Sequence, residues 1–122
     1  MQVHSVLIPV KDIDSAISFY TKKLFFKKKK DISKIDKKTG LKYRKVSLVS
    51  NQSKNAIEIE FSTLINSFSP LLIYQKELHR LGVPYLYLSV ANIDVDYERL
   101  LSLGIEFSVK PELIGIQKIA VF

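Results

Sequence analysis

The feature of this sequence that most constrains its fold is a pattern that occurs twice, 80 residues apart. Placing Val10 on Val90 without a gap aligns Asp12 with Asn92, and both are residue types that cap helices. A short β-branched run precedes each cap, and an apolar stripe at helical spacing follows it. A repeated unit with one apolar face cannot bury that face alone, so two copies are expected to complete one core.

The first copy, residues 1–61, is predicted to have the element order β-α-β-β-β. Its helix is expected to start at Asp12 or Asp14, whose carboxylates can accept hydrogen bonds from free backbone amides. Ile13, Ile17 and Tyr20 then fall on one apolar face. The predicted strands span residues 3–10, 25–30, 43–49 and 56–61, and residues 31–40 are predicted to form a polar loop.

Residues 62–83 are predicted to be a connector that contains one helix. Ser69 can cap this helix, Pro70 suits its first position and Gly82 can end it. The second copy, residues 84–122, then repeats the opening pattern. Its predicted elements are strands at 85–90, 105–109 and 114–122 and a helix at 95–103 that Gly104 ends.

Length and composition exclude several classes of protein. A chain of 122 residues that is 47% hydrophobic can bury an ordinary core, so we expect one folded domain. The absence of cysteine excludes disulfides, thiol nucleophiles and thiolate metal sites. No apolar run reaches the roughly 20 residues of a membrane span, and the N-terminus lacks the pattern of a secretion signal. We therefore expect a cytoplasmic protein.

The net charge of +7 is concentrated in the first copy, which contains a run of four lysines: Lys27, Lys28, Lys29 and Lys30. Such a run can attract nucleic acid or an acidic ligand. It can equally belong to a solvated strand whose lysines discourage edge-to-edge pairing. The second interpretation is favoured, because no recognition helix or aromatic stacking motif accompanies the run.

Two groups of motifs carry a resemblance to a known family. The first is the segment 10–20, Val-Lys-Asp-Ile-Asp-Ser-Ala-Ile-Ser-Phe-Tyr, followed by Leu24-Phe25-Phe26. The second is the segment 88–94, Leu-Ser-Val-Ala-Asn-Ile-Asp, followed by residues 97–100 and 103–107. Together they resemble the start of each module in the vicinal oxygen chelate superfamily, which includes glyoxalase I, bleomycin-resistance proteins and extradiol dioxygenases. Phe25 stands where this family usually has glycine.

The resemblance implies an α+β fold of two tandem βαβββ modules that form a curved half-barrel sheet, with helices on the convex side and a cleft on the concave side. It implies a single domain over residues 1–122, with module one at 1–61 and module two at 84–122. Module two is expected to lack its last strand, which the family pattern places beyond Phe122. Family members often dimerise, so the resemblance also implies a homodimer.

Metal-dependent members of this family hold a divalent ion on four strands of the cleft, where it acts as a Lewis acid on two adjacent substrate oxygens. The first ligand position falls on Ser5 rather than on His4, which strand alternation would place on the helix side. The second falls on Glu58, with Glu60 as a rival on the same face. The third falls on Tyr85, a poor ligand while its phenol is neutral. The fourth falls beyond the last residue.

At most one of the four ligand positions carries a residue that binds metal well. The comparison with the family therefore favours a cleft without a metal. The residues expected to line this cleft are Ser5, Leu7, Glu58, Glu60, Tyr85 and Tyr87. Simpler interpretations stay open: the two glutamates can lie on a solvent-exposed sheet face, and the two tyrosines can belong to the core.

We therefore expect a small-molecule-binding protein of the glyoxalase/bleomycin-resistance type, with no cofactor and no membrane or nucleic-acid partner. Its ligand and any catalytic residues are unknown. The alternative is a lyase, isomerase or dioxygenase that depends on Zn, Ni, Mn or Fe held by Glu58, with His4 as a further candidate ligand. A third hypothesis is a basic module that binds acidic partners through residues 27–30.

Overall fold

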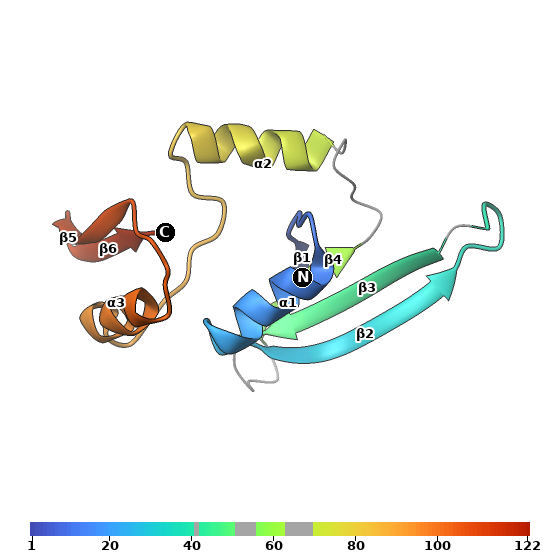
Figure 1. Cartoon of the computed structure of the whole chain (residues 1–122), viewed down its shortest axis with the longest axis horizontal. Coiled ribbons are helices and arrows are strands. Elements are labelled where there is room, and N and C mark those ends of the chain that lie inside the picture. Colours follow the sequence, from blue (N-terminus) through green and yellow to red (C-terminus); the bar gives the residue numbers. More distant parts are fainter. Residues whose placement is uncertain (41, 51–55, 63–69) are drawn as a thin grey trace. The chain divides into compact units, whose positions relative to one another are not determined.

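The computed structural model describes residues 1–40, 42–50, 56–62 and 70–122 (Figure 1). The chain divides into two compact units, unit 1 (Met1–Arg80) and unit 2 (Leu81–Phe122). Unit 1 contains β1 (Ser5–Leu7), α1 (Ile13–Lys22), β2 (Lys27–Ile35), β3 (Lys42–Val49), β4 (Glu58–Ser62) and α2 (Pro70–Arg80). Unit 2 contains α3 (Ile93–Ser102), β5 (Val109–Ile114) and β6 (Gln117–Val121). The fold is α+β, and the β-α-β-β-β order predicted for the first copy is confirmed.

The four strands of unit 1 form one sheet in the order β1-β4-β3-β2. β1 and β4 are parallel, and the other neighbouring strands are antiparallel. β2 is an edge strand, and a register shift between Lys28 and Lys30 marks a β-bulge with Lys29 as the extra residue. β2 continues to Ile35, so the polar loop predicted from residue 31 onward is wrong for its first five residues. Backbone pairing with β3 holds this segment in the sheet despite its polar side chains.

α1 covers one face of this sheet with its apolar stripe. Asp12 caps the helix, because its carboxylate accepts a hydrogen bond from the backbone amide of Ser15 at 3.2 Å. Ile13 and Tyr20 are the buried residues of the helix, and the Tyr20 ring centroid lies 5.4 Å from that of Phe61 in β4. The other buried apolar side chains of β3 and β4 are Val46, Leu48 and Ile59. This helix-covered face is the core of unit 1.

Phe25 adopts a left-handed backbone conformation, with a φ of +61°, shortly after α1. It is the residue that stands where the family pattern has glycine. A side chain in this conformation costs about 1–2 kcal/mol, because its Cβ crowds the following carbonyl oxygen. The Phe25 side chain is largely exposed, so its burial offsets little of that cost.

We expect the substitution Phe25→Gly to raise the free energy of unfolding by up to about 1 kcal/mol, since relief of backbone strain exceeds the entropy that glycine adds to the unfolded chain. Urea denaturation measures the change. Phe25→Ala is the matched control, because it removes the same ring but keeps the Cβ. A midpoint for Phe25→Gly no higher than that for Phe25→Ala would show that the conformation carries no strain.

Unit 2 consists of α3 and the β5–β6 hairpin. Asn92 caps α3, and its side-chain oxygen accepts hydrogen bonds from the backbone amides of Asp94 and Val95 at 3.1 and 3.2 Å. The Phe107 ring lies edge-on to Tyr97 on α3, with centroids 4.8 Å apart. The helix predicted over residues 95–103 is therefore confirmed, and it starts two residues earlier.

Of the three strands predicted for unit 2, one is absent and two differ in their bounds. The strand predicted over 85–90 is absent, since no residue from 83 to 92 belongs to a strand and no described strand pairs with this backbone. β6 (Gln117–Val121) lies within the strand predicted over 114–122, whereas the strand predicted over 105–109 is displaced to β5 (Val109–Ile114), and the two form a tight hairpin. Its turn starts at Gly115, whose φ of +64° suits a two-residue hairpin loop. The tandem arrangement of two βαβββ modules is not confirmed, and the half-barrel stays a prediction.

α2 confirms the helix predicted inside the connector, and it starts at Pro70 as expected. Its predicted cap, Ser69, lies outside the described residues. Gly82 follows the helix with a φ of +70°, a conformation typical of residues just past a helix end. Among the described helices, none has the length and apolar character needed to cross a membrane.

Candidate functional site

The sheet of unit 1 has a second face, opposite the core, that carries the predicted site residues of this unit. The strand register places Ser5 beside Glu58. The same pairing places Leu7 beside Glu60, and β3 adds Ser47 as the antiparallel partner of Glu60. We call this surface the polar face. Its central residues are Ser5, Leu7, Lys27, Lys29, Lys30, Lys45, Ser47, Val49, Glu58 and Glu60.

Glu58 is the most enclosed charged residue of the polar face, with 1% of its surface exposed. Its Oε1 accepts a hydrogen bond from the ammonium of Lys29 at 2.5 Å. This bond holds the pKa of Glu58 below its ordinary value of 4.5, although burial acts in the opposite direction. The Lys29 side chain is half exposed, so the carboxylate lies close beneath the surface rather than deep in a core.

The β-bulge in β2 explains how two consecutive lysines reach the same face. In a regular strand, Lys29 and Lys30 would point to opposite faces. The extra residue breaks this alternation: Lys30 pairs in register with Ser47, while Lys29 reaches Glu58. The charge of Lys30 adds a smaller contribution to the lowered pKa of Glu58. The bulge therefore increases the positive charge next to the buried carboxylate.

His4 lies nearer to Glu58 than strand alternation predicted. We expected its side chain on the helix side of the sheet. In the structure its Nε2 lies 3.9 Å from Oε1 of Glu58, and the imidazole is largely exposed. His4 immediately precedes β1, so the alternation of that strand does not fix the direction of its side chain.

Ser47 is the unsatisfied polar group of the polar face. It is 2% exposed, and its Oγ has no hydrogen-bond partner among the described residues. The hydroxyl lies near enough to Glu58 to lower the pKa of that carboxyl, but the two groups are not in hydrogen-bonding geometry. Its neighbour Glu60 is half-buried and pairs with Lys45 at 3.2 Å. A buried hydroxyl without a partner is uncommon, because it has lost its bonds to water without replacement.

The glutamates are thus on one face, as predicted, and the simpler interpretation of a solvent-exposed face does not describe Glu58. Ile59 lies between the two glutamates in the sequence and Phe61 follows them, and both are buried on the opposite side of the sheet. The strand β4 therefore alternates between an apolar core and a charged face whose central carboxylate is shielded from water.

Substituting Glu58 by glutamine should change how stability depends on pH. A carboxyl whose pKa is lower in the folded than in the unfolded chain stabilises the fold above its unfolded pKa, and this contribution is lost as pH falls through its folded pKa. The wild type should therefore lose stability as pH falls below about 4.5, and Glu58→Gln should lose less. Urea denaturation at pH 7 and pH 3 measures this. A stability difference between the two proteins that stays constant over this range would contradict it.

Tyr85 and Tyr87, the other predicted cleft residues, lie in unit 2. They are 49% and 77% exposed, so they do not belong to the core of that unit. Unit 1 by itself brings together Ser5, Leu7 and the two glutamates. The assignment of the two tyrosines to the same site stays a prediction.

The donors of the polar face do not form a metal site. Among residues 1–40, 42–50, 56–62 and 70–122, no three His, Asp or Glu side chains are placed to hold an ion together. The Lys29 ammonium already neutralises the carboxylate of Glu58, and it would repel a divalent cation there. The residues of the polar face by themselves therefore do not fit the divalent ion that the family resemblance implies.

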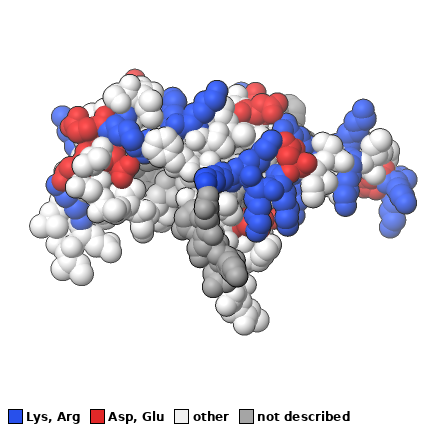
Figure 2. Space-filling view, turned by 90° about the horizontal axis from the view of Figure 1, so that it is seen from below, with Lys and Arg blue, Asp and Glu red and all other residues white. Residues whose placement is uncertain are grey.

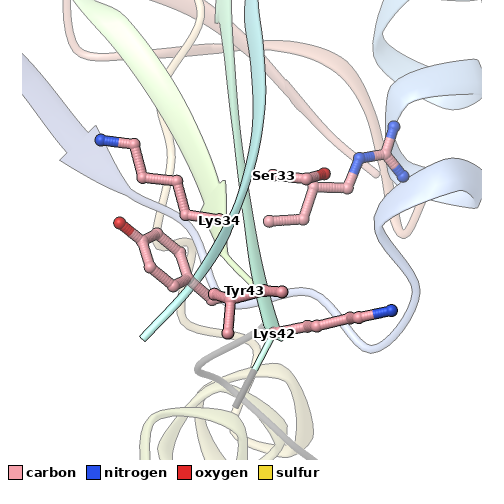
Figure 3. A pocket seen from close by; sticks show the side chains of 6 residues that line it. Ser33, Lys34, Lys42 and Tyr43 are labelled. Carbon is pink, nitrogen blue, oxygen red and sulfur yellow. The ribbon is translucent and has the colours of Figure 1, made fainter. Parts of the chain in front are cut away.

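An open cavity of about 750 Å³ lies along the other end of the β2–β3 hairpin. The residues that line it are Ser33, Lys34, Ile35, Lys42, Tyr43 and Arg44. Figure 3 shows that Lys34 and Tyr43 extend to one side of the hairpin, whereas Ser33 and Lys42 extend to the other. Because these side chains diverge, they cannot hold one ligand together, and we do not place the site in this cavity.

The lysine run at residues 27–30 lies on the edge strand of the sheet. Every residue of β2 is exposed, and Figure 2 shows lysine and arginine atoms gathered over the β2–β3 hairpin. Charged side chains and a bulge on an edge strand oppose pairing with another chain. This placement supports the interpretation favoured from the sequence, except that Lys29 and Lys30 also reach the polar face.

Sequence reasoning did not assign five hydrophilic residues of the polar face to the candidate site: Lys27, Lys29, Lys30, Lys45 and Ser47. Lys45 and Ser47 did carry a signal, because they alternate with the buried residues of the predicted strand 43–49 and so had to lie opposite the core. Lys29 carried none, since four consecutive lysines have no periodicity that would reveal a bulge.

Comparisons with known proteins place this arrangement in context. A family model described as the Glyoxalase/Bleomycin resistance protein/Dioxygenase superfamily matches residues 2–122. The chain is also 34% identical over 122 residues to the uncharacterized protein YurT of Bacillus subtilis strain 168. That alignment covers 100% of this chain and 90% of the relative.

Solved structures share the fold. The crystal structure of UcmS2 matches with a TM-score of 0.70 and 24% identity, over 98% of this chain and 87% of that one. A glyoxalase/bleomycin resistance protein/dioxygenase superfamily member from Sphaerobacter thermophilus DSM 20745 matches at 0.68 and 23%, over 98% and 86%. The trypanothione-dependent glyoxalase I of Leishmania major matches at 0.58 and 17%, over 92% and 73%. At these identities the likeness concerns the fold alone.

Proposed function

This chain belongs to the Glyoxalase/Bleomycin resistance protein/Dioxygenase superfamily, and from that premise we propose that it binds a small molecule on the polar face without a metal ion. The observation that carries the proposal is the bond between Glu58 and Lys29. The family resemblance puts a metal ligand at Glu58, but here this carboxylate holds an ammonium group. The side chains around it are therefore free to contact an organic ligand directly.

The chemistry of the polar face suits such a ligand. Small-molecule sites combine apolar surface with a few polar groups that fix orientation. Leu7 supplies exposed apolar surface, and the hydroxyls of Ser5 and Ser47 supply donors and acceptors. Lys29 forms an ion pair with Glu58, and Lys45 forms one with Glu60. These ion pairs keep the four side chains in defined positions around the hydroxyls.

The alternative expected from the sequence is a metal-dependent lyase, isomerase or dioxygenase. The Lys29 ammonium argues against it, because an ion would have to displace this group from Glu58. Calorimetric titration of the whole chain with Ni²⁺, Zn²⁺, Mn²⁺ and Fe²⁺ separates the two functions. We expect no stoichiometric binding. Tight one-site binding that Glu58→Gln abolishes would favour the metal-dependent enzyme.

Ligand binding is tested on protein treated with EDTA, so that no metal contributes. A library of small aromatic and aliphatic compounds is added to the ¹⁵N-labelled chain, and ¹H–¹⁵N spectra report which backbone amides respond. Compounds that bind should shift the amide signals of Ser5, Ser47 and Glu58 together. A library that shifts only signals outside the polar face would remove the proposal.

Two further expectations accompany this proposal: a homodimer, which the family resemblance implies, and a cytoplasmic location, which the composition of the chain implies. Light scattering of the eluting protein in size-exclusion chromatography tests the first. A mass of one chain at all concentrations would contradict the homodimer.

A further inference from the structure

The polar face carries more positive charge than its carboxylates neutralise. Four lysines, Lys27, Lys29, Lys30 and Lys45, face two glutamates. Lys29 and Lys45 each pair with one glutamate. Within the described part of the chain, Lys27 and Lys30 have no ion-pair partner. Neither ammonium group is neutralised by an ion pair on this face, although the charge of Lys30 still acts on Glu58.

Lys30 and Ser47 are direct cross-strand neighbours. The Ser47 hydroxyl is buried and without a partner among the described residues, while the Lys30 side chain beside it is exposed. Because the Lys30 side chain is long and exposed, we expect it to move at little cost and to leave the neighbouring hydroxyl open to a ligand. An anionic oxygen can then accept one hydrogen bond from the ammonium and another from the hydroxyl, which are the charge-assisted bonds that bind anions best.

Glu60 and Glu58 set a limit on how the ligand can lie. Glu60 flanks Ser47 on the side away from Lys30, and its carboxylate repels another anion. The anionic group is therefore directed toward β2, over Lys30 and Lys27, and the remainder of the ligand toward Leu7 and β1. A cationic ligand would be repelled by Lys27 and Lys30, and both carboxylates that could attract it are already in ion pairs.

We propose that the ligand of the polar face is a small anionic molecule, whose carboxylate or phosphate is held by the Lys30 ammonium and the Ser47 hydroxyl. This inference rests on the proposed function, because it names the class of ligand for the same face. Lys29 takes a different role: its bond to Glu58 neutralises the buried carboxylate that would otherwise repel the anion.

The test compares three pools of small aromatic compounds of similar size on the EDTA-treated chain. The anionic pool is benzoate and phenyl phosphate, the neutral pool benzamide and benzyl alcohol, and the cationic pool benzylamine and benzamidine. Inorganic phosphate is a fourth arm that measures the contribution of the anionic group alone. Binding is followed through the amide signals of Ser5, Ser47 and Glu58 in ¹H–¹⁵N spectra.

We expect the anionic pool to bind the polar face most tightly. Lys30→Gln should weaken benzoate and phenyl phosphate about tenfold, and Ser47→Ala about threefold, since each removes one bond to the anionic group. Lys42→Gln is the matched control: it removes the same charge from an exposed lysine on the opposite face of the sheet. It should change affinity by less than about twofold, because its charge is screened at that distance.

The outcomes distinguish this inference from the proposed function. If Lys30→Gln and Lys42→Gln weaken the affinity for the anionic compounds equally, the inference is overturned. Affinity would then depend on the net charge of the protein and not on a specific site at Lys30. Binding of the neutral or cationic pool to the polar face, unaffected by Lys30→Gln, would overturn it too, while the proposed function would stand. If no pool shifts the polar-face signals, both fall.

Discussion

Replacing Phe61 by alanine should lower the free energy of unfolding of unit 1 by about 3–5 kcal/mol, the largest loss we expect from a single substitution. Phe61 is completely buried at the centre of the sheet, where its ring packs against Tyr20 of α1. Alanine would leave a cavity that the surrounding side chains cannot fill, because β3 and β4 hold the backbone in register. The helix would lose the contact between the Tyr20 and Phe61 rings.

Urea denaturation followed by the ¹H–¹⁵N signals of each unit measures this loss separately for units 1 and 2. Ile35→Ala is the matched control, because Ile35 is 61% exposed on the edge strand of the same sheet. It should cost less than about 0.5 kcal/mol, as is usual for surface positions. A similar loss from both substitutions would contradict the placement of the core between α1 and the sheet.

The substitution Lys29→Met should destabilise unit 1 by about 2 kcal/mol at pH 7, because it leaves the buried carboxylate of Glu58 without its counter-charge. Breaking a fully buried pair costs more, about 3–5 kcal/mol, but Lys29 is half exposed and water weakens the interaction. Methionine keeps most of the length of the side chain, so packing changes little. Urea denaturation at pH 7 gives the difference.

A double-mutant cycle separates the charge from the side chain itself. In the Glu58→Gln background, Lys29→Met should cost less than half as much, since no buried charge is then left unpaired. Lys28→Met is the control on the same strand; its pair with Asp31 is exposed and should contribute less than about 0.5 kcal/mol. Equal losses from Lys28→Met and Lys29→Met would show that Glu58 does not depend on Lys29.

The fold of unit 1 was predictable because its signals are local. The stripe of α1 with its Asp12 cap, and the alternation of β4, each describe one element without reference to the rest of the chain. The failures in unit 2 have the opposite cause. A strand exists only where a neighbour pairs with it, and no local pattern at Tyr85–Val90 reveals that none of the described strands of unit 2 does so. Gly115 was overlooked as a turn because apolar residues surround it.

The candidate site was predictable in part for the same reason. Alternation in β4 placed Glu58 and Glu60 together on one face, and the buried positions of Ile59 and Phe61 agree with it. The partner of Glu58 was not predictable, because Lys29 is 29 residues away in sequence and reaches it through a bulge. Tertiary pairing across β2, β3 and β4 decides which lysine meets the carboxylate, and the sequence of β2 contains five lysines.

The central claim is that Glu58 binds Lys29 and that the polar face binds its ligand without a metal ion. The most direct test measures whether Mn²⁺ binds at this face. Bound Mn²⁺ broadens the NMR signals of nearby nuclei, so its position is read residue by residue from ¹H–¹⁵N spectra of the whole chain. With one equivalent of Mn²⁺, we expect the amide signals of Ser5, Ser47 and Glu58 to keep their intensity relative to the other signals. Selective loss of these three signals, restored by Glu58→Gln, would contradict the claim.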